Sequence, residues 1–239
     1  MRRSTPLVSA LLVALAACAS GPSGGPPEGF ELVYGQDFEG DAWCVDFGAS
    51  DPAAWGPGTV DGNGTAALRG PALRAGPWGS PGDFLWLDGV VLGDFVLEFD
   101  VLVPEGGASE VDVYLAAESP ERFVYASLAP RATERTHDVF RVDHAAPLAI
   151  SRSRTFGVAL TPGVWHHVVV ARSTLVGRVT VAFGDEGVAL TAGNGALAEG
   201  WIGFGARGGA ARFDHLRVWA PEFSMRALDG LTPPAQSRR

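Results

Sequence analysis

The chain has 239 residues, and its 18 basic and 27 acidic side chains give a formal net charge of −9. This acidic balance argues against a nucleic-acid-binding protein, which needs a basic surface to displace counterions. Two cysteines are too few for a disulfide scaffold or a thiolate metal cluster. A content of 46% hydrophobic and 19% charged residues excludes a mainly disordered chain and predicts a folded domain.

Residues 1–17 have the composition of an export signal. Arg2 and Arg3 provide a charged start, and the apolar stretch Pro6–Ala17 is shorter than the roughly 20 residues that cross a bilayer. We therefore expect a secretory signal rather than a membrane helix. No later segment approaches the roughly 18 consecutive apolar residues of a membrane-spanning helix.

The signal ends in Leu15-Ala16-Ala17-Cys18, which resembles a bacterial lipobox, the motif in which the cysteine is lipidated and becomes the new N-terminus. The alternative is an ordinary signal peptide with an incidental cysteine. We expect lipidation at Cys18, because its position, the preceding apolar run and the small residues beside it agree with the motif. Several acyl chains on one cysteine hold a protein firmly on a membrane. The expected location is then the cell envelope, with membrane contact through the lipid anchor only. Ala19, in place of Asp, favours the outer membrane over the inner one. We expect no disulfide at Cys44, and we interpret this residue as a small buried side chain.

Residues 18–29 form a tether rich in Gly, Pro and Ser, and residues 223–239 form a polar tail that we expect to be loose. Between them, residues 30–222 carry strand signals at short, regular spacing, with turn residues between them. In chain order the clearest are 94–103, 110–116, 122–129, 137–143, 165–172, 177–183, 201–206 and 212–219. Such a series without a helical repeat predicts one all-β domain of two packed antiparallel sheets.

The alternation of apolar and polar residues predicts which side chains point away from the core. In the three segments from 94 to 129, the outward set includes Glu98, Asp100, Glu110, Asp112, Tyr114 and Tyr125. Because consecutive strands usually pair, we expect these side chains to form one surface patch. Carboxylates beside aromatic rings are typical of a sugar-binding site, in which rings stack on sugar faces and carboxylates bind hydroxyl groups. The alternative is an ordinary solvated strand face.

Paired carboxylates on this patch are also the groups from which a glycosidase is built. Residues two apart on one strand face lie about 6.5–7 Å apart, within the range of an acid and a base that flank a glycosidic bond. Glu98/Asp100 and Glu110/Asp112 both have this spacing, and we take Glu110 and Asp112 as the candidate catalytic pair. The E-x-D-x-x-E motif of laminarinase-type jelly rolls is incomplete, because Leu115 stands where the second glutamate belongs. None of the five histidines has the spacing of a zinc site.

Several short motifs follow one another along the domain. They are Gln36–Glu39, Ser50–Trp55, Gly93–Glu98, Gly163–His166, Gly177–Val181, Gly200–Gly205 and Phe213–Trp219. In this order they resemble the concanavalin A-like jelly-roll domains grouped as 3-keto-disaccharide hydrolase-like proteins. The resemblance implies a two-sheet jelly roll with a concave glycan-binding face, and a hydrolase that acts on oxidised disaccharides.

The resemblance also implies a structural Ca²⁺ ion that joins the first and last strands. Asp37, Glu39 and Asp214 are the matching oxygen ligands, and the alternative is that these aspartates cap turns. No other cofactor is expected. His137 and Arg141 are expected to line the same groove as the outward carboxylates and tyrosines.

We therefore expect an envelope lipoprotein whose jelly roll binds a glycan on its concave face. One alternative is a glycoside hydrolase of 3-keto-disaccharides that uses a Glu/Asp pair. A second alternative is a structural or interaction module of a surface complex that binds no sugar. Sandwich folds carry all three functions, so the fold class does not choose among them.

Overall fold

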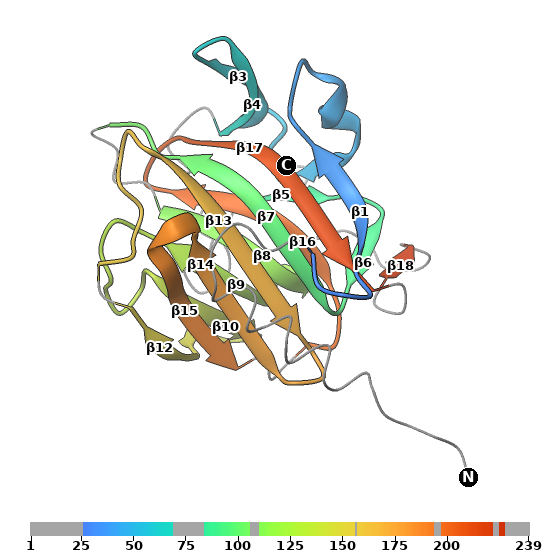
Figure 1. The fold of residues 1–239 in the computed structure, drawn as a ribbon, viewed down its shortest axis with the longest axis vertical. Coiled ribbons are helices and arrows are strands. Elements are labelled where there is room, and N and C mark those ends of the chain that lie inside the picture. The colour runs from blue at the N-terminus through green and yellow to red at the C-terminus, as the bar shows by residue number, and fades with distance from the viewer. Residues whose placement is uncertain are drawn as a thin grey trace.

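The computed structural model describes residues 26–68, 84–105, 110–155, 157–193, 197–221 and 225–227. The predicted signal, Cys18 and the tether up to residue 25 lie outside the described residues. Two antiparallel sheets pack face to face, which confirms the all-β jelly-roll sandwich (Figure 1). Helical structure in the described part consists of short 3-10 turns, among them η1 (Ala42–Val45) and η3 (Gly184–Glu186). No helix there is long and apolar enough to cross a membrane.

Sheet A has nine strands in the order β12-β15-β14-β13-β7-β17-β4-β3, and β1 also pairs with β17. These are β1 (Glu31–Gln36), β3 (Trp55–Val60), β4 (Asn63–Leu68), β7 (Phe95–Leu102), β12 (Ser151–Arg154), β13 (Trp165–Ser173), β14 (Arg178–Phe183), β15 (Gly187–Gly193) and β17 (Ala211–Ala220). Figure 1 shows the outer face of this sheet, with β13, β7 and β17 in its centre.

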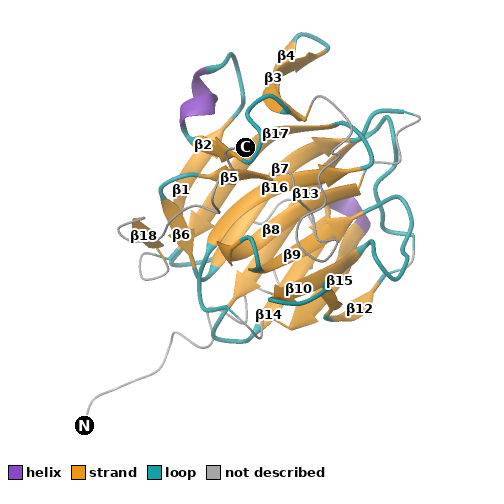
Figure 2. Ribbon diagram, turned by 180° about the vertical axis from the view of Figure 1, so that it is seen from behind, coloured by secondary structure: helices purple, strands orange, loops and turns teal. Residues whose placement is uncertain are grey.

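Sheet B has seven strands in the order β11-β10-β9-β8-β16-β5-β2, and it lies in front in Figure 2. These are β2 (Phe47–Ala49), β5 (Phe84–Leu87), β8 (Glu110–Ser119), β9 (Arg122–Leu128), β10 (Asp138–Asp143), β11 (Leu148–Ala149) and β16 (Trp201–Arg207). A separate pair is formed by β6 (Val90–Leu92) and β18 (Met225–Ala227).

The main core lies between the two sheets and is filled by the apolar half of each alternating strand. Phe99 and Phe213 of sheet A contact Phe204 of sheet B, with ring centroids 5.0 and 4.8 Å apart. All three side chains are at most 2% exposed. Burying one phenylalanine side chain stabilises the folded state by about 1.5–3 kcal/mol. These contacts therefore hold the two sheets together.

The chain crosses from sheet A to sheet B between β7 and β8. Strand β7 pairs with β13 and β17, whereas β8 pairs with β9 and β16. The prediction that the outward side chains of 94–103 and 110–116 share one patch is therefore wrong. Each sheet turns its apolar side chains toward the common core, so the two outward sets face opposite sides of the sandwich.

Two smaller expectations also need correction. The tail is not loose throughout, because Met225–Ala227 pairs with Val90–Leu92 as β18 and β6. Residues 222–224 and 228–239 lie outside the described part of the chain. Cys44 lies in η1 and is exposed rather than buried, since its neighbour Trp43 takes the inward position and is 2% exposed.

Candidate functional site

The outer face of sheet B, seen in Figure 2, carries a cluster of aromatic rings that is separate from the main core. Tyr114, Tyr125, Phe140 and Trp201 belong to it, and each is at most 3% exposed. Tyr125 stacks on Phe140 with centroids 5.2 Å apart, and Tyr114 lies 6.1 Å from Tyr125. Both tyrosines point away from the main core, as the alternation predicts. The expected open stacking platform is absent, because the ring faces pack against one another.

Arg207, the last residue of β16, binds two carboxylates beside this cluster. Its Nε donates to Asp112 Oδ2 at 2.9 Å and its Nη2 donates to Asp112 Oδ1 at 3.1 Å, which is the bidentate geometry of a strong pair. The same Nη2 lies 2.9 Å from Ser127 Oγ and 3.0 Å from Glu110 Oε2. Strand pairing brings these groups together, since Arg207 lies opposite Glu110 and Asp112 lies opposite Ser127.

Burial dominates the protonation behaviour of this group. It raises the pKa of the Asp112 carboxyl and that of Glu110, and the charge of Arg207 opposes both shifts. Burial also disfavours the guanidinium charge, but the two carboxylates outweigh it and the pKa of Arg207 lies above its ordinary value. The Asp112 side chain has 0% exposure, against 25% for Glu110. Asp112 is therefore closed to a substrate, so Glu110 and Asp112 cannot lie on either side of a substrate's glycosidic bond as the predicted catalytic pair would.

A groove opens beside Arg207. Its empty space is about 770 Å³, counted with the solvent at its mouth. The lining residues are Tyr125, Glu134, Arg135, Phe140, Ala146, Pro147 and Arg207. No described residue accepts a hydrogen bond from Nη1 of Arg207, which leaves that nitrogen available to a ligand. The groove thus combines apolar carbon, including that of Ala146 and Pro147, with charged groups that can bind hydroxyls, as saccharide sites do.

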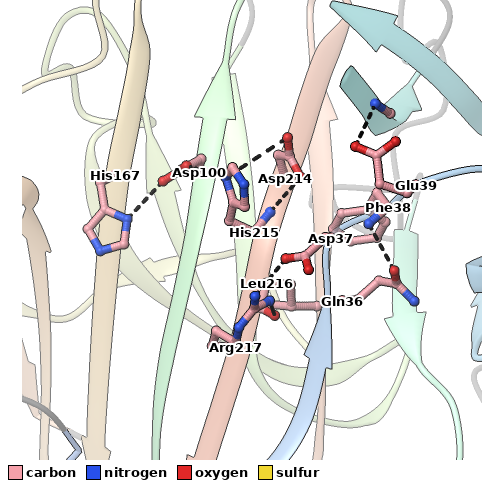
Figure 3. Close-up of polar contacts among 11 residues, drawn as sticks. Gln36, Asp37, Phe38, Glu39, Asp100, His167, Asp214, His215, Leu216 and Arg217 are labelled. Carbon is pink, nitrogen blue, oxygen red and sulfur yellow. Dashed lines mark hydrogen bonds and ion pairs between the residues drawn. The ribbon is translucent and has the colours of Figure 1, made fainter. Parts of the chain in front are cut away.

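Glu98 and Asp100 lie on the outer face of sheet A and take no part in this groove. Asp100 Oδ1 lies 2.8 Å from His167 Nδ1, and Asp100 Oδ2 lies 2.8 Å from His215 Nδ1 (Figure 3). Burial raises the pKa of Glu98. They therefore do not share one patch with Glu110, Tyr114 and Tyr125, because β7 lies in sheet A and β8 and β9 lie in sheet B. Two imidazoles contact the Asp100 oxygens, and the assignment of Glu98 and Asp100 to a glycan site stays a prediction.

His137 and Arg141 also lie away from the groove. His137 precedes β10, is 3% exposed, and its ring centroid lies 6.4 Å from that of Phe183 in the main core. Arg141 lies directly opposite Val124, whose side chain belongs to the main core, so it occupies the side of sheet B away from Tyr125. The prediction was wrong for Arg141 because the period of two gives the outward position to Phe140.

The three carboxylates expected to bind calcium each have a partner within the protein (Figure 3). Asp37 Oδ1 accepts a hydrogen bond from Arg217 at 2.6 Å. Glu39 accepts one from the backbone N–H of Gly64 at 3.2 Å, and Asp214 accepts one from the following backbone N–H at 2.7 Å. Among the described residues, no group of three or more His, Cys, Asp and Glu side chains could hold a metal ion. Calcium binding thus gains no support here and stays a prediction.

Sequence reasoning missed Arg207 and Phe140, although a signal existed for one of them. Phe140 has the outward position in the alternation of 137–143, and that pattern could have placed it beside Tyr125. Arg207 is 95 residues from Asp112 in the chain, and only the order of strands in sheet B brings the two together.

No protein-family model matches the sequence, and no curated protein matches it. Solved structures, however, share its fold. A protein of unknown function with a galectin-like fold from Bacillus subtilis superimposes with a TM-score of 0.55 at 12% identity, covering 79% of this chain and 97% of that one. Carbohydrate-binding module CBM66 from the same organism gives a TM-score of 0.52 at 13% identity, covering 73% and 96% of the two chains.

A third similar structure is domain 4 of AbnA, a GH43 extracellular arabinanase from Geobacillus stearothermophilus, in complex with arabinotriose. Its TM-score is 0.52 at 15% identity, and the match covers 81% of this chain and 94% of that one. At such identities the likeness shows the fold alone. This chain is therefore similar to galectin-like jelly rolls, including carbohydrate-binding and GH43-associated domains.

Proposed function

We propose that this chain binds carbohydrate in the groove beside Arg207. The supporting observation is a guanidinium that is fixed by the buried Asp112 and keeps Nη1 for a ligand, at the edge of a groove lined by Tyr125 and Phe140. A donor that is already fixed loses little rotamer freedom when it binds, which favours affinity. Sugar hydroxyls would bind this donor and the groove's charged wall, while sugar C–H faces would contact the apolar carbons.

The similar structures support the same proposal. Two of them are a carbohydrate-binding module and a domain in complex with arabinotriose. Those ligands belong to those proteins, and they make neutral oligosaccharides a reasonable first set of probes for this one.

Binding is proposed rather than hydrolysis. Cleavage of a glycosidic bond needs an acid and a second carboxylate as base or nucleophile. Among the described residues that line the groove, Glu134 alone carries a carboxylate. We expect 3-keto-disaccharides incubated with the protein to remain intact when followed by chromatography. Products that disappear in a Glu110→Gln variant would restore the hydrolase alternative.

The binding proposal is tested on the groove wall, with the chain carrying Cys18→Ser to avoid lipidation. Glu134 and Arg135 are exposed, so Glu134→Gln/Arg135→Gln should leave the fold intact. Calorimetric titration with arabinotriose and with xylo-, cello- and fructo-oligosaccharides should show at least one ligand. Its affinity should fall at least tenfold in this variant.

The matched control is Glu121→Gln/Arg122→Gln, which makes the same chemical change at the far end of β9. The ion pairs of these two side chains are exposed and contribute about 0–1 kcal/mol to stability. Affinity should therefore stay within twofold of the parent protein. Equal losses of affinity in both variants, or no loss in either, would show that the ligand does not bind in this groove.

We also propose that a lipid on Cys18 displays the domain from the cell envelope, with the outer membrane as the favoured location. This part of the proposal rests on the sequence of residues 15–18 and on Ala19. Residues 18–29 would then act as a flexible Gly/Pro/Ser spacer between the membrane and the first strand.

A further inference from the structure

A second groove lies where the chain crosses from sheet B to sheet A, between β11 and β12. Its empty space is about 1210 Å³, counted with the solvent at its mouth. The walls are β12 (at the lower left edge in Figure 1), the turn at 157–161, and Pro130, Ala132 and His137 before β10. This groove shares no lining residue with the groove beside Arg207.

The base of this second groove is held by hydrogen bonds between β10 and β12. Val139 N donates to Ser151 Oγ at 3.0 Å, and Ser151 N donates to Asp138 Oδ1 at 3.2 Å. Asp138 is also paired with Arg154 at 2.6 Å, and its own side chain is 1% exposed. The crossing is thus a fixed corner of the sandwich, and the groove that it forms is built into the fold.

The charges that line the second groove are all positive or neutral. Its described lining includes Arg152, Arg154 and His137, and no Asp or Glu. The charge of Arg154 is balanced from beneath by Asp138. Arg152 is exposed, and no carboxylate that lines the groove balances its charge. A local positive charge of this kind selects anions, although the chain as a whole carries −9.

The surroundings of Arg152 define where an anion would lie. Arg152 occupies an irregularity in the β12–β15 pairing, between Ser151 and Ser153. Its guanidinium lies over Gly193 of β15, which does not line the groove, so the charge stands at the rim of the groove on the outer side of sheet A. Ser153 and Thr155, also in the lining, are exposed and present hydroxyl groups. A planar guanidinium matches a carboxylate, and hydroxyls match the ring substituents of a sugar.

We propose that the second groove binds an acidic saccharide through the carboxylate of a uronic acid residue, which Arg152 receives at the rim of the groove. The choice of a saccharide rests on the proposed function, whereas the choice of an anion rests on the lining of this groove alone. Ser153 and Thr155 bind hydroxyls of the same sugar unit. The chain then has two separate sites, a groove on sheet B for neutral sugar and this edge groove for an acidic one.

The test uses trigalacturonate and its fully methyl-esterified form, titrated into the Cys18→Ser chain by calorimetry in low-salt buffer. The acid should bind at least tenfold more tightly than the ester, and its affinity should fall as salt is added. Arg152→Gln should weaken the acid at least tenfold. Arg122→Gln removes the same charge at a distant position and should change affinity less than twofold.

Three results would overturn the proposal. They are no binding of trigalacturonate, equal affinity for acid and ester, and an Arg152→Gln variant that binds the acid like the parent protein. Loss of binding in Glu134→Gln/Arg135→Gln, with Arg152→Gln unaffected, would place the acid in the groove on sheet B and also overturn it. Failure of the neutral sugars alone would contradict only the proposed function.

Discussion

Asp112 is a fully buried carboxylate on a strand, and its ionised form depends on one partner. Arg207 contacts both of its oxygens, and the neighbouring Ser127 contacts the same guanidinium nitrogen. An isolated buried charge costs several kcal/mol of desolvation, so such groups persist where a partner is well placed. The ion pair therefore fixes the position of Arg207. It also makes the stability of the domain sensitive to loss of the Arg207 charge.

Arg207→Gln should expose this dependence. The substitution leaves Asp112 buried without a compensating charge, and we expect the free energy of unfolding to fall by about 3–5 kcal/mol. Urea denaturation at pH 7 measures the loss. The double variant Asp112→Asn/Arg207→Gln should recover a large part of it, because both charges are then gone. A single variant as stable as the parent protein would contradict the role given to the pair.

The Asp100 cluster on sheet A gives a pH dependence with a defined sign. Burial would raise the pKa of Asp100, but its hydrogen bonds with His167 and His215 outweigh burial and the pKa is lowered. The hydrogen bond with Asp100 raises the pKa of both histidines. The stabilisation is lost as pH falls through the lowered pKa of Asp100, and also as pH rises through the raised histidine values. It is therefore greatest between the unfolded-state values, about 4 for Asp and about 6.5 for His.

Thermal unfolding of the parent protein and of Asp100→Asn at low salt tests this window. The difference in Tm between the two should be largest near pH 5–6 and should shrink as the pH rises through the raised pKa values of the two histidines. His215 is 57% exposed, so added salt should reduce the difference. A difference that is constant from pH 5 to pH 8 would show that the cluster contributes no charge interaction.

At the scale of elements, the alternation of apolar and polar residues predicted well which way side chains point. It predicted poorly which strands pair. It placed Tyr114 and Tyr125 on the side away from the main core, since a strand with one buried face has a period of two. It could not predict that β7 and β8 belong to different sheets, because a crossover and a hairpin leave the same pattern in each strand. The sequence therefore predicted the site residues on β8 and β9 but not Arg207 on β16.

Gly203 shows how closely β16 approaches its neighbour β5. A Cβ at Gly203 would lie 2.4 Å from the backbone oxygen of Leu85 and 2.8 Å from Cα of Trp86. Neither atom can move without disturbing the strand pairing, so Gly203→Ala should cost about 3 kcal/mol of unfolding free energy. In Gly35→Ala the nearest atom is a flexible arginine carbon at 3.4 Å, and stability should change little. Chemical denaturation measures the unfolding free energy of both variants. Equal stabilities would contradict the close approach of β16 to β5.

At the scale of the whole molecule, the proposed lipid anchor makes a simple prediction. Cys18→Ser removes the lipidated side chain, so the protein should move from the membrane fraction of cells to the soluble fraction of the envelope. Fractionation followed by immunoblotting measures the distribution. Retention in the membrane fraction would mean that something other than the lipid holds the domain there.

The position of strand β17 in sheet A affects when the chain can fold. This strand is the last long strand among the described residues, yet it lies inside sheet A, where it pairs with β1, β4 and β7. Sheet A cannot close until residues 211–220 have been synthesised. Pairing between segments so far apart in the chain is slow, so the newly made polypeptide remains open for some time. An open polypeptide is the form that can be threaded through a translocation channel, and the late strand thus gives the proposed export signal time to act before the sandwich locks.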